Sequence, residues 1–308
     1  MRTDRPTHEG GGERGSIAIV ALWGVALIAL LLVAAGFTTH GEVLIARNAV
    51  AAARARLAAE AGTQLGLAEL LRRHQDNAAI FAGAPATWHD GDAAVRIAIV
   101  DEAGKIDINE APLELLTGLF VAVGRSQNEA ALLACNILDR RGDAASPCPE
   151  PSTDDQGRPR TYRFMAPEEL AQLPGFDDAL YDRIADCVTV ATGASAIDPL
   201  VASRTVLLAL PGASGTLIDA YLANRDMLAD LASTGAGLPP IPAAAFLMAS
   251  PRRDFTIEAL ATTPDGARFR ADLQVRLTGQ AAHPYQVMAW RSPPADRTTS
   301  PPRARRIP

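Results

Sequence analysis

The 308-residue chain contains little lysine, histidine, cysteine or aromatic side chain. Lys105 is its only lysine, and the 29 basic residues are scattered and outnumbered by 35 acidic ones, so the sequence shows no basic patch of the kind that binds nucleic acid. No close pair of cysteines or histidines is present, which excludes a structural zinc site of the usual spacing. The sequence also has no nucleophile motif and no phosphate-binding glycine loop. We therefore expect no catalytic residues and a protein that is not an enzyme.

Charge is missing altogether from Ser16 to Phe37. At a rise of about 1.5 Å per residue this stretch spans roughly 33 Å as a helix, enough to cross a hydrocarbon core of about 30 Å. Arg2, Arg5 and Arg14 precede it, and this bias places the N-terminus in the cytoplasm and the rest of the chain across the membrane. The sequence thus predicts a single-pass segment at 16–37.

Three interpretations of this N-terminus remain open. A secretory signal would be cut after Val33-Ala34-Ala35, although its apolar stretch is normally about 7 to 15 residues long. An uncleaved anchor fits the length but leaves the abrupt change at Gly15 unexplained. In the third interpretation, a basic leader ending at Gly15 is removed on the cytoplasmic side and the apolar helix stays, with Ser16 as the new terminus.

The helical pattern continues to about Arg73 with no proline. Gly36, Gly41 and Gly62 are expected to bend this helix, and a break into two helices near Thr39 is the alternative. Apolar positions recur among charges in a way that predicts one buried stripe against a folded domain. The leucines of that expected stripe are Leu44, Leu57, Leu65 and Leu71.

Four runs are typical of strands, with a turn signal at Pro264-Asp265-Gly266. They are Ala93 to Val100, Phe255 to Leu260, Phe269 to Leu277 and Tyr285 to Trp290. Because the first run is far from the other three, the pattern predicts an antiparallel sheet interrupted by a long insertion. A helix laid on such a sheet defines an α+β fold.

The insertion, 109–242, reads as helical hairpins. Asn109 is expected to cap a helix with Pro112 in its first turn, and Asp198-Pro199 is expected to start another. Leu-Pro-Gly turns at 173–175 and 210–212 each join two amphipathic helices.

Leu-Pro-Gly turns also occur in helix-hairpin-helix modules, whose backbone amides can meet a DNA phosphate. The alternative function is therefore an exported, membrane-anchored adaptor that binds DNA or envelope partners. Asp177 and Asp178 follow the first turn and place negative charge where phosphate would sit, which argues against DNA.

Cys135, Cys148 and Cys187 permit three single disulfide pairings and leave one thiol over. Cys135 with Cys148 closes a short loop and is the candidate pair in an oxidising compartment. Cys187 is then a small buried apolar residue.

Several phrases, in their order along the chain, resemble the type II secretion system protein K family, the GspK-like minor pseudopilins. They are the Gly15-Ser16 junction, Asp107 to Pro112, Ile137 to Arg141, the hairpin from Pro167 to Phe176, and the strands from Phe269 to Trp290. The resemblance covers most of the chain.

The resemblance implies that prepilin peptidase cuts between Gly15 and Ser16 and that the new terminus is methylated. Major pilins carry a glutamate at the fifth mature position, where this chain has Val20. Loss of that acid is a feature of the K-type subunits, which sit at the pseudopilus tip. In major subunits that acid can neutralise the terminal amine of the subunit ahead, because a buried charge is costly unless paired. A subunit at the tip has no subunit ahead of it and does not need the acid.

The resemblance further implies a pilin-like long N-terminal helix on a small antiparallel sheet with a large inserted all-helical domain. The expected parts are a cleaved leader at 1–15, the transmembrane and periplasmic parts of the helix at 16–37 and 38–76, a β domain at 77–108 and 243–291, the insertion at 109–242, and a disordered tail at 292–308.

The implied partners are other minor pseudopilins, the major pseudopilin, prepilin peptidase and the inner-membrane secretion platform, with no nucleic acid. The implied location is the bacterial inner membrane, with the bulk of the chain periplasmic. Relatives hold calcium in the inserted domain, and acidic loops suit that ion. The candidate ligands are Asp139, Asp143, Glu150, Asp154 and Asp155.

Overall fold

The computed structural model describes residues 13–75, 85–143, 148–149, 156, 161–228 and 241–295. The chain forms two compact units, Met1–Arg54 and Ala55–Pro308. The leader up to residue 12 and the tail from 296 lie outside the described residues. The domain boundaries expected at 76, 108 and 242 stay predictions.

Helix α1 runs from Glu13 to Gln75 without a break, which confirms one long helix and removes the alternative of two helices split near Thr39. Ion pairs between residues three or four positions apart support its exposed face near the C-terminal end, as Arg56 with Glu60 and Arg72 and Arg73 with Glu69. Basic side chains in the last turn also suit the negative end of the helix dipole.

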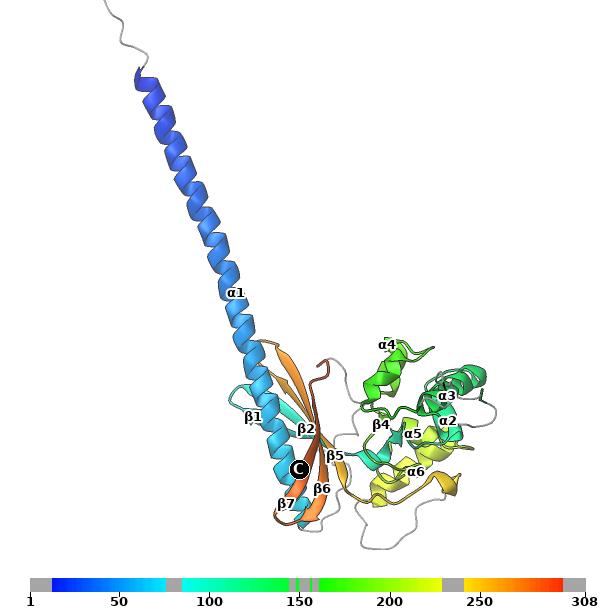
Figure 1. Ribbon diagram of the computed structural model, residues 1–308. Helices are drawn as coiled ribbons and strands as arrows, with labels where there is room; N and C mark the ends of the chain where they lie inside the picture. Colours follow the sequence, from blue (N-terminus) through cyan, green and yellow to red (C-terminus); the bar gives the residue numbers. More distant parts are fainter. Residues whose placement is uncertain are drawn as a thin grey trace, which may run out of the picture. The chain divides into compact units, whose positions relative to one another are not determined.

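A five-stranded antiparallel sheet lies in the second unit, in the order β1-β2-β5-β6-β7 (Figure 1). The strands are β1 (Ala86–Asp90), β2 (Ala93–Asp101), β5 (Asp254–Thr262), β6 (Arg268–Gln280) and β7 (His283–Arg291). All four predicted strands are confirmed, whereas β1 was missed because its five residues are mostly exposed and show no apolar alternation. The central pairing of β2 with β5 joins segments about 150 residues apart, with Asp101 opposite Phe255.

The part of α1 in the second unit packs on one face of this sheet (Figure 1). Alternate strand residues such as Val95, Ile257 and Leu273 meet Leu67 and Leu70 of the helix. Their burial removes apolar surface from water, the main favourable term in folding.

The expected leucine stripe is wrong at Leu44, Leu57 and Leu65, which are exposed, whereas Leu71 is partly buried against the core. Small residues, among them Ala58 and Ala59, face the sheet. Gly62 and Gly66 explain the preference for small side chains. A Cβ added at Gly62 would lie 2.6 Å from Val95 Cγ1, and one at Gly66 would lie 2.5 Å from Ile257 Cγ2. Gly62 therefore permits close helix–sheet approach, and α1 stays helical through it.

The chain between β2 and β5 carries the remaining helices. They are η1 (Glu102–Gly104), α2 (Leu113–Ala122), α3 (Gln127–Arg141), η2 (Pro167–Gln172), α4 (Asp178–Ile184), α5 (Arg204–Leu208), α6 (Gly215–Leu228) and η3 (Ala244–Phe246). All of these helices except η1 contribute to a second apolar core, which includes Phe120, Ile137, Leu170 and Tyr221.

Two short strands also lie in this segment and pair in parallel, β3 (Ile106–Asp107) and β4 (Val188–Thr189). The expectation of an all-helical insertion missed β4, because two residues carry no readable periodicity. Ile197 and Leu247 form a similar isolated parallel bridge. Each bridge ties the start of a helical hairpin to a later, distant stretch of chain.

Candidate functional site

The first candidate site is the apolar surface of α1 in the first unit. From Ile19 to Leu31 its large side chains are exposed. Val20, which stands where major pilins carry a glutamate, is 71% exposed. A contiguous exposed apolar surface of this size marks a site of contact with protein or lipid. The exposed residues are Ile19, Val20, Leu22, Trp23, Val25, Leu27, Ile28, Leu30 and Leu31.

Within the parts of the chain that the structure describes, no helix combines the length and the apolar character needed to cross a membrane. Gly15 and Ser16 lie in the first turns of α1, and their side chains are outside the described set. Cleavage between them stays a prediction.

The second candidate site is a buried polar junction where the helical segment leaves β2 and rejoins β5. Glu102 is 2% exposed, and its carboxylate binds Lys105 Nζ at 2.7 Å and accepts hydrogen bonds from Thr189 and Thr256. Burial opposes the ionisation of Glu102, but the charge of Lys105 and these hydrogen bonds outweigh it and lower the Glu102 pKa. The only lysine of the sequence thus neutralises a buried acid that bridges β4, β5 and η1.

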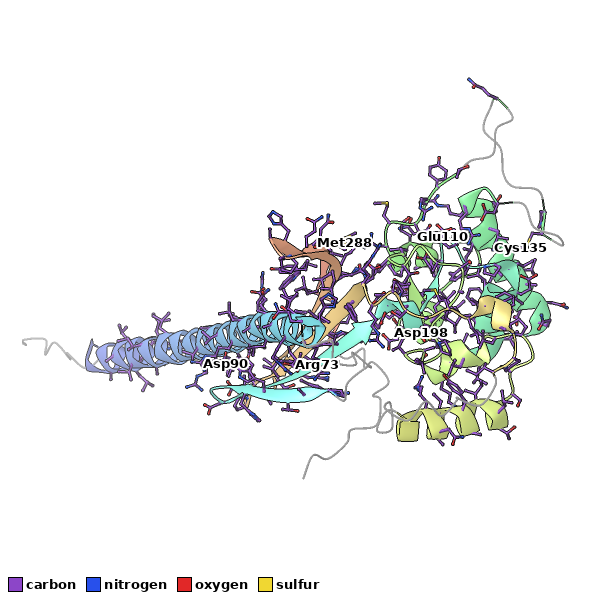
Figure 2. The ribbon with its side chains drawn as sticks, turned by 90° about the horizontal axis from the view of Figure 1, so that it is seen from below. Arg73, Asp90, Glu110, Cys135, Asp198 and Met288 are labelled. Atoms are coloured by element: carbon purple, nitrogen blue, oxygen red, sulfur yellow. A yellow bond between two sulfur atoms is a disulfide. The ribbon has the colours of Figure 1, made fainter. Side chains whose placement is uncertain are left out.

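Asp101 and Asp198 hold the two crossing segments together through Ser250. Ser250 Oγ donates to Asp101 at 2.7 Å, and the Ser250 backbone N–H donates to Asp198 at 2.8 Å. Burial raises the Asp101 pKa to about 6, against the lowering effect of the hydrogen bonds from Ser250 and Ala103. Figure 2 labels Asp198 at this junction, between the sheet and the helices of the second unit.

The sheet face that points away from α1 continues this network. Arg270 pairs with Glu258 at 3.2 Å and with Asp272 at 2.9 Å, and burial raises the Glu258 pKa to about 7. Arg276 binds Asp254 at 2.5 Å and donates to the Ala191 carbonyl at 2.6 Å. A sheet face built from paired charges packs against the helical segment through specific polar contacts, which fix geometry more than they add stability.

Two of the sequence predictions about helix starts are wrong. Asn109 does not cap α2: its side chain pairs with the Phe164 backbone, donating to the carbonyl at 3.0 Å and accepting from the N–H at 2.8 Å. The α2 N-cap is Pro112, which makes no side-chain cap bond. Asp198 likewise starts a turn, and Ser203 caps α5. Capping residues are recognised by local spacing, but these side chains are taken by partners far away in sequence.

Asp107 and Asp198 instead begin two equivalent turns, which sequence reading did not find. Each carboxylate accepts the backbone N–H two residues on, from Asn109 at 2.9 Å and from Leu200 at 2.8 Å. An arginine at the end of a later helix then binds the carbonyls one and four residues after the aspartate. Arg141 does so at Ile108 and Ala111, and Arg225 at Pro199 and Ala202.

Both Leu-Pro-Gly turns join helices as predicted, η2 to α4 and α5 to α6. Gly175 and Gly212 have φ of 81° and 77°, the left-handed conformation that glycine tolerates. Asp177 accepts the Leu180 N–H at 2.6 Å and so satisfies the N-terminus of α4 with a carboxylate. The carboxylate thus places negative charge at the N-terminus of α4.

Cys135 and Cys148 form a disulfide with a Cα–Cα distance of 5.4 Å. Cys187 is a buried thiol, and burial raises its pKa to about 11. A thiol of that pKa carries almost no thiolate at neutral pH and is a poor nucleophile.

The calcium site stays a prediction, because the structure describes only two of its five candidate ligands. Glu150, Asp154 and Asp155 lie outside the described residues, and Asp143 is ion-paired with Arg141. Asp139 lies in the last turn of α3. The described residues contain no group of three or more acidic, histidine or cysteine side chains that could hold a metal ion.

No protein-family model matches the chain, and no curated protein matches it. Among solved structures, the chain is similar to one chain of the crystal structure of the GspK-GspI-GspJ complex from the type 2 secretion system of enterotoxigenic Escherichia coli. The TM-score is 0.50 at 12% identity, and the match covers 82% of this chain and 98% of that chain. The likeness shows a shared fold, a long N-terminal helix packed on an antiparallel sheet with additional helices.

Proposed function

We propose that this protein is a minor pseudopilin of a type II secretion system, located at the pseudopilus tip, where it supports assembly and limits growth. The observation that carries the proposal is the fold likeness to a chain of the GspK-GspI-GspJ complex over 98% of that chain. The order of sequence phrases that resemble the K family supports it independently. The role is structural and not enzymatic.

The exposed apolar residues from Ile19 to Leu31 fit such a role. Before assembly, the uncharged stretch at 16–37 holds the subunit in the inner membrane with its N-terminus in the cytoplasm and its bulk in the periplasm. During assembly, the same surface packs against the helices of other minor pseudopilins and the major pseudopilin. Both surroundings are apolar, so one helix serves in both.

The tip position follows from Val20 and from the inserted helices. Val20 stands where an acid would neutralise the terminal amine of a subunit ahead, and a subunit at the tip has none ahead. The large helical domain proposed at 109–242 then covers the upper surface of the pilin-like part and prevents another subunit from adding.

The first experiment is mass spectrometry of the N-terminus of the membrane-extracted protein, in cells with and without prepilin peptidase. We expect a mature, methylated Ser16 that depends on the peptidase. An intact Met1 would leave a simple anchor, and a start at Gly36 would identify an ordinary secreted protein. Either result would contradict the pseudopilin assignment.

A further inference from the structure

The two edges of the five-stranded sheet differ in their protection. β7 is an edge strand, and within the described residues β6 is its one sheet neighbour. It is nine residues long and exposes Val287 at 51%, Met288 at 43% and Trp290 at 45%. Figure 2 labels Met288 on this strand. A long edge with unpaired backbone groups and exposed apolar side chains is a template for another strand.

The opposite edge strand, β1, has features that hinder the addition of another strand. It is only five residues long, ends at Asp90, and is followed by the turn at Gly91-Asp92. From Thr278 to Ala295, in contrast, the chain has no carboxylate, and Arg291 is its one permanent charge. Pro284 blocks a single amide near the start of β7, which leaves Tyr285 to Arg291 as the open edge.

The pairing of β6 with β7 shifts register at Met288, between Ala289 opposite Gln274 and Val287 opposite Val275. This bulge divides the open edge into two short regular runs. A strand that pairs with β7 must follow the same break, so the bulge restricts which segments fit.

Charge indicates the occupant. From Arg291 to the C-terminus the sequence has five arginines and one aspartate, in a chain whose net charge is -6. A second copy of β7 offers no acidic side chain to this basic stretch, whereas an acidic segment would be attracted to it. We propose that the β7 edge binds an extended segment of another protein in which apolar and acidic side chains alternate, by addition of a strand to the sheet.

The proposal is tested with the full chain in detergent micelles and a synthetic peptide of alternating valine and glutamate. We expect saturable binding and slowed hydrogen exchange at the Tyr285 to Arg291 amides. Val287→Glu should weaken binding by at least about tenfold, because it places a like charge within the paired edge. Thr87→Glu, an exposed position on β1, adds the same charge to the other edge and should leave binding unchanged.

A peptide with the same side chains but N-methylated at every residue is the second control, because it lacks the amide donors of a strand. Equal binding of this peptide, protection away from β7, or no saturable binding would overturn the proposal. Protection of β7 that rises with protein concentration in the absence of peptide would overturn it as well, by identifying a second copy as the occupant. None of these outcomes depends on processing at Gly15, so the proposed function stands or falls separately.

Discussion

Single residues decide how the helical segment is joined to the sheet. Asp101 and Glu258 are carboxyls buried at this junction, and burial raises their pKa values to about 6 and about 7. Each is held by a partner from another element: Ser250 for Asp101, and Arg270 for Glu258. The stability of this junction therefore depends on pH near neutrality.

The folded chain holds the Asp101 proton more tightly than the unfolded chain, whose carboxyl has a pKa near 3.8. The stability that Asp101 contributes is complete below that pH and is lost as the pH rises through about 6, with a total on the order of 3 kcal/mol. We expect Asp101→Asn to flatten the dependence of unfolding free energy on pH between about 4 and 6, the interval between the unfolded and folded pKa values. The unfolding free energy of both proteins is measured by guanidinium denaturation at several pH values.

Asp265→Asn, in the exposed turn between β5 and β6, is the matched control for Asp101→Asn and should keep the wild-type pH slope. If Asp101→Asn and wild type have parallel pH profiles, the carboxyl is ionised in the folded chain throughout this range and the account of the junction is wrong.

Among the described glycines, Gly118 of α2 is the one approached most closely by another element, the end of α5. A Cβ added at Gly118 would lie 1.9 Å from the Ala209 carbonyl oxygen. That oxygen belongs to the backbone, which cannot move aside as the end of a flexible side chain can. Gly118→Ala should therefore destabilise the protein by about 2 kcal/mol or more, despite the better helix propensity of alanine. Thermal unfolding checks the loss.

Gly215→Ala, at the start of α6, is the comparison for Gly118→Ala, since its nearest neighbour would be Arg204 Nη2 at 3.4 Å, an ordinary contact. It should be neutral or slightly stabilising. Equal effects of the two substitutions would show that packing at the α2–α5 crossing is looser than the structure indicates.

The Cys135–Cys148 disulfide ties α3 to the loop that follows it, with a sequence separation of 13. A closed loop of this length lowers the entropy of the unfolded chain and stabilises by about 3 kcal/mol. We expect the double substitution Cys135→Ser and Cys148→Ser to lower the unfolding free energy by roughly that amount, measured by chemical denaturation. The control is Cys187→Ala, which leaves the bridge intact. A reductant that cleaves the bridge should lower the stability of this variant, as it does for the wild type, and should have no effect on the double variant.

At the scale of the whole molecule, the helical segment is removable in principle because its two ends meet. Asp101 and Phe255 are opposite each other in the sheet, so an Asn-Gly turn can join them and close a β2–β5 hairpin. The face this uncovers carries Thr256, Glu258 and Arg270, which water can solvate, so the sheet and α1 should still fold.

In cells, we expect the hairpin variant to be processed normally and to give longer pseudopili, seen by electron microscopy of surface fibres, because it no longer blocks addition at the tip. Secretion should fall. The control is a full-length chain with only the Asn-Gly turn inserted at the exposed 264–266 turn. Fibres of unchanged length, with the variant present in the membrane, would count against the growth-limiting role.

The sequence alone determined the elements whose cause is local. An apolar, proline-free stretch forms α1, and alternating side chains with a turn at Pro264-Asp265-Gly266 form β5 and β6, since 3.6-residue and 2-residue periods are visible in a single segment. The Leu-Pro-Gly turns were also predicted, because their signal lies within three consecutive residues. The fold class followed from these elements and their order.

Only the tertiary structure decided what depends on distant partners. It placed glycine and alanine beside Leu67 and Leu70 on the buried face of α1, and left Leu57 and Leu65 exposed. It also paired the Asn109 side chain with the Phe164 backbone, Asp198 with the Ser250 N–H, and the only lysine with Glu102. It also showed that Arg141 and Arg225 close two equivalent aspartate turns. A side chain's spacing along the chain does not show which group will reach it across 50 or more residues, and a buried polar group takes whichever partner the fold brings within hydrogen-bond distance.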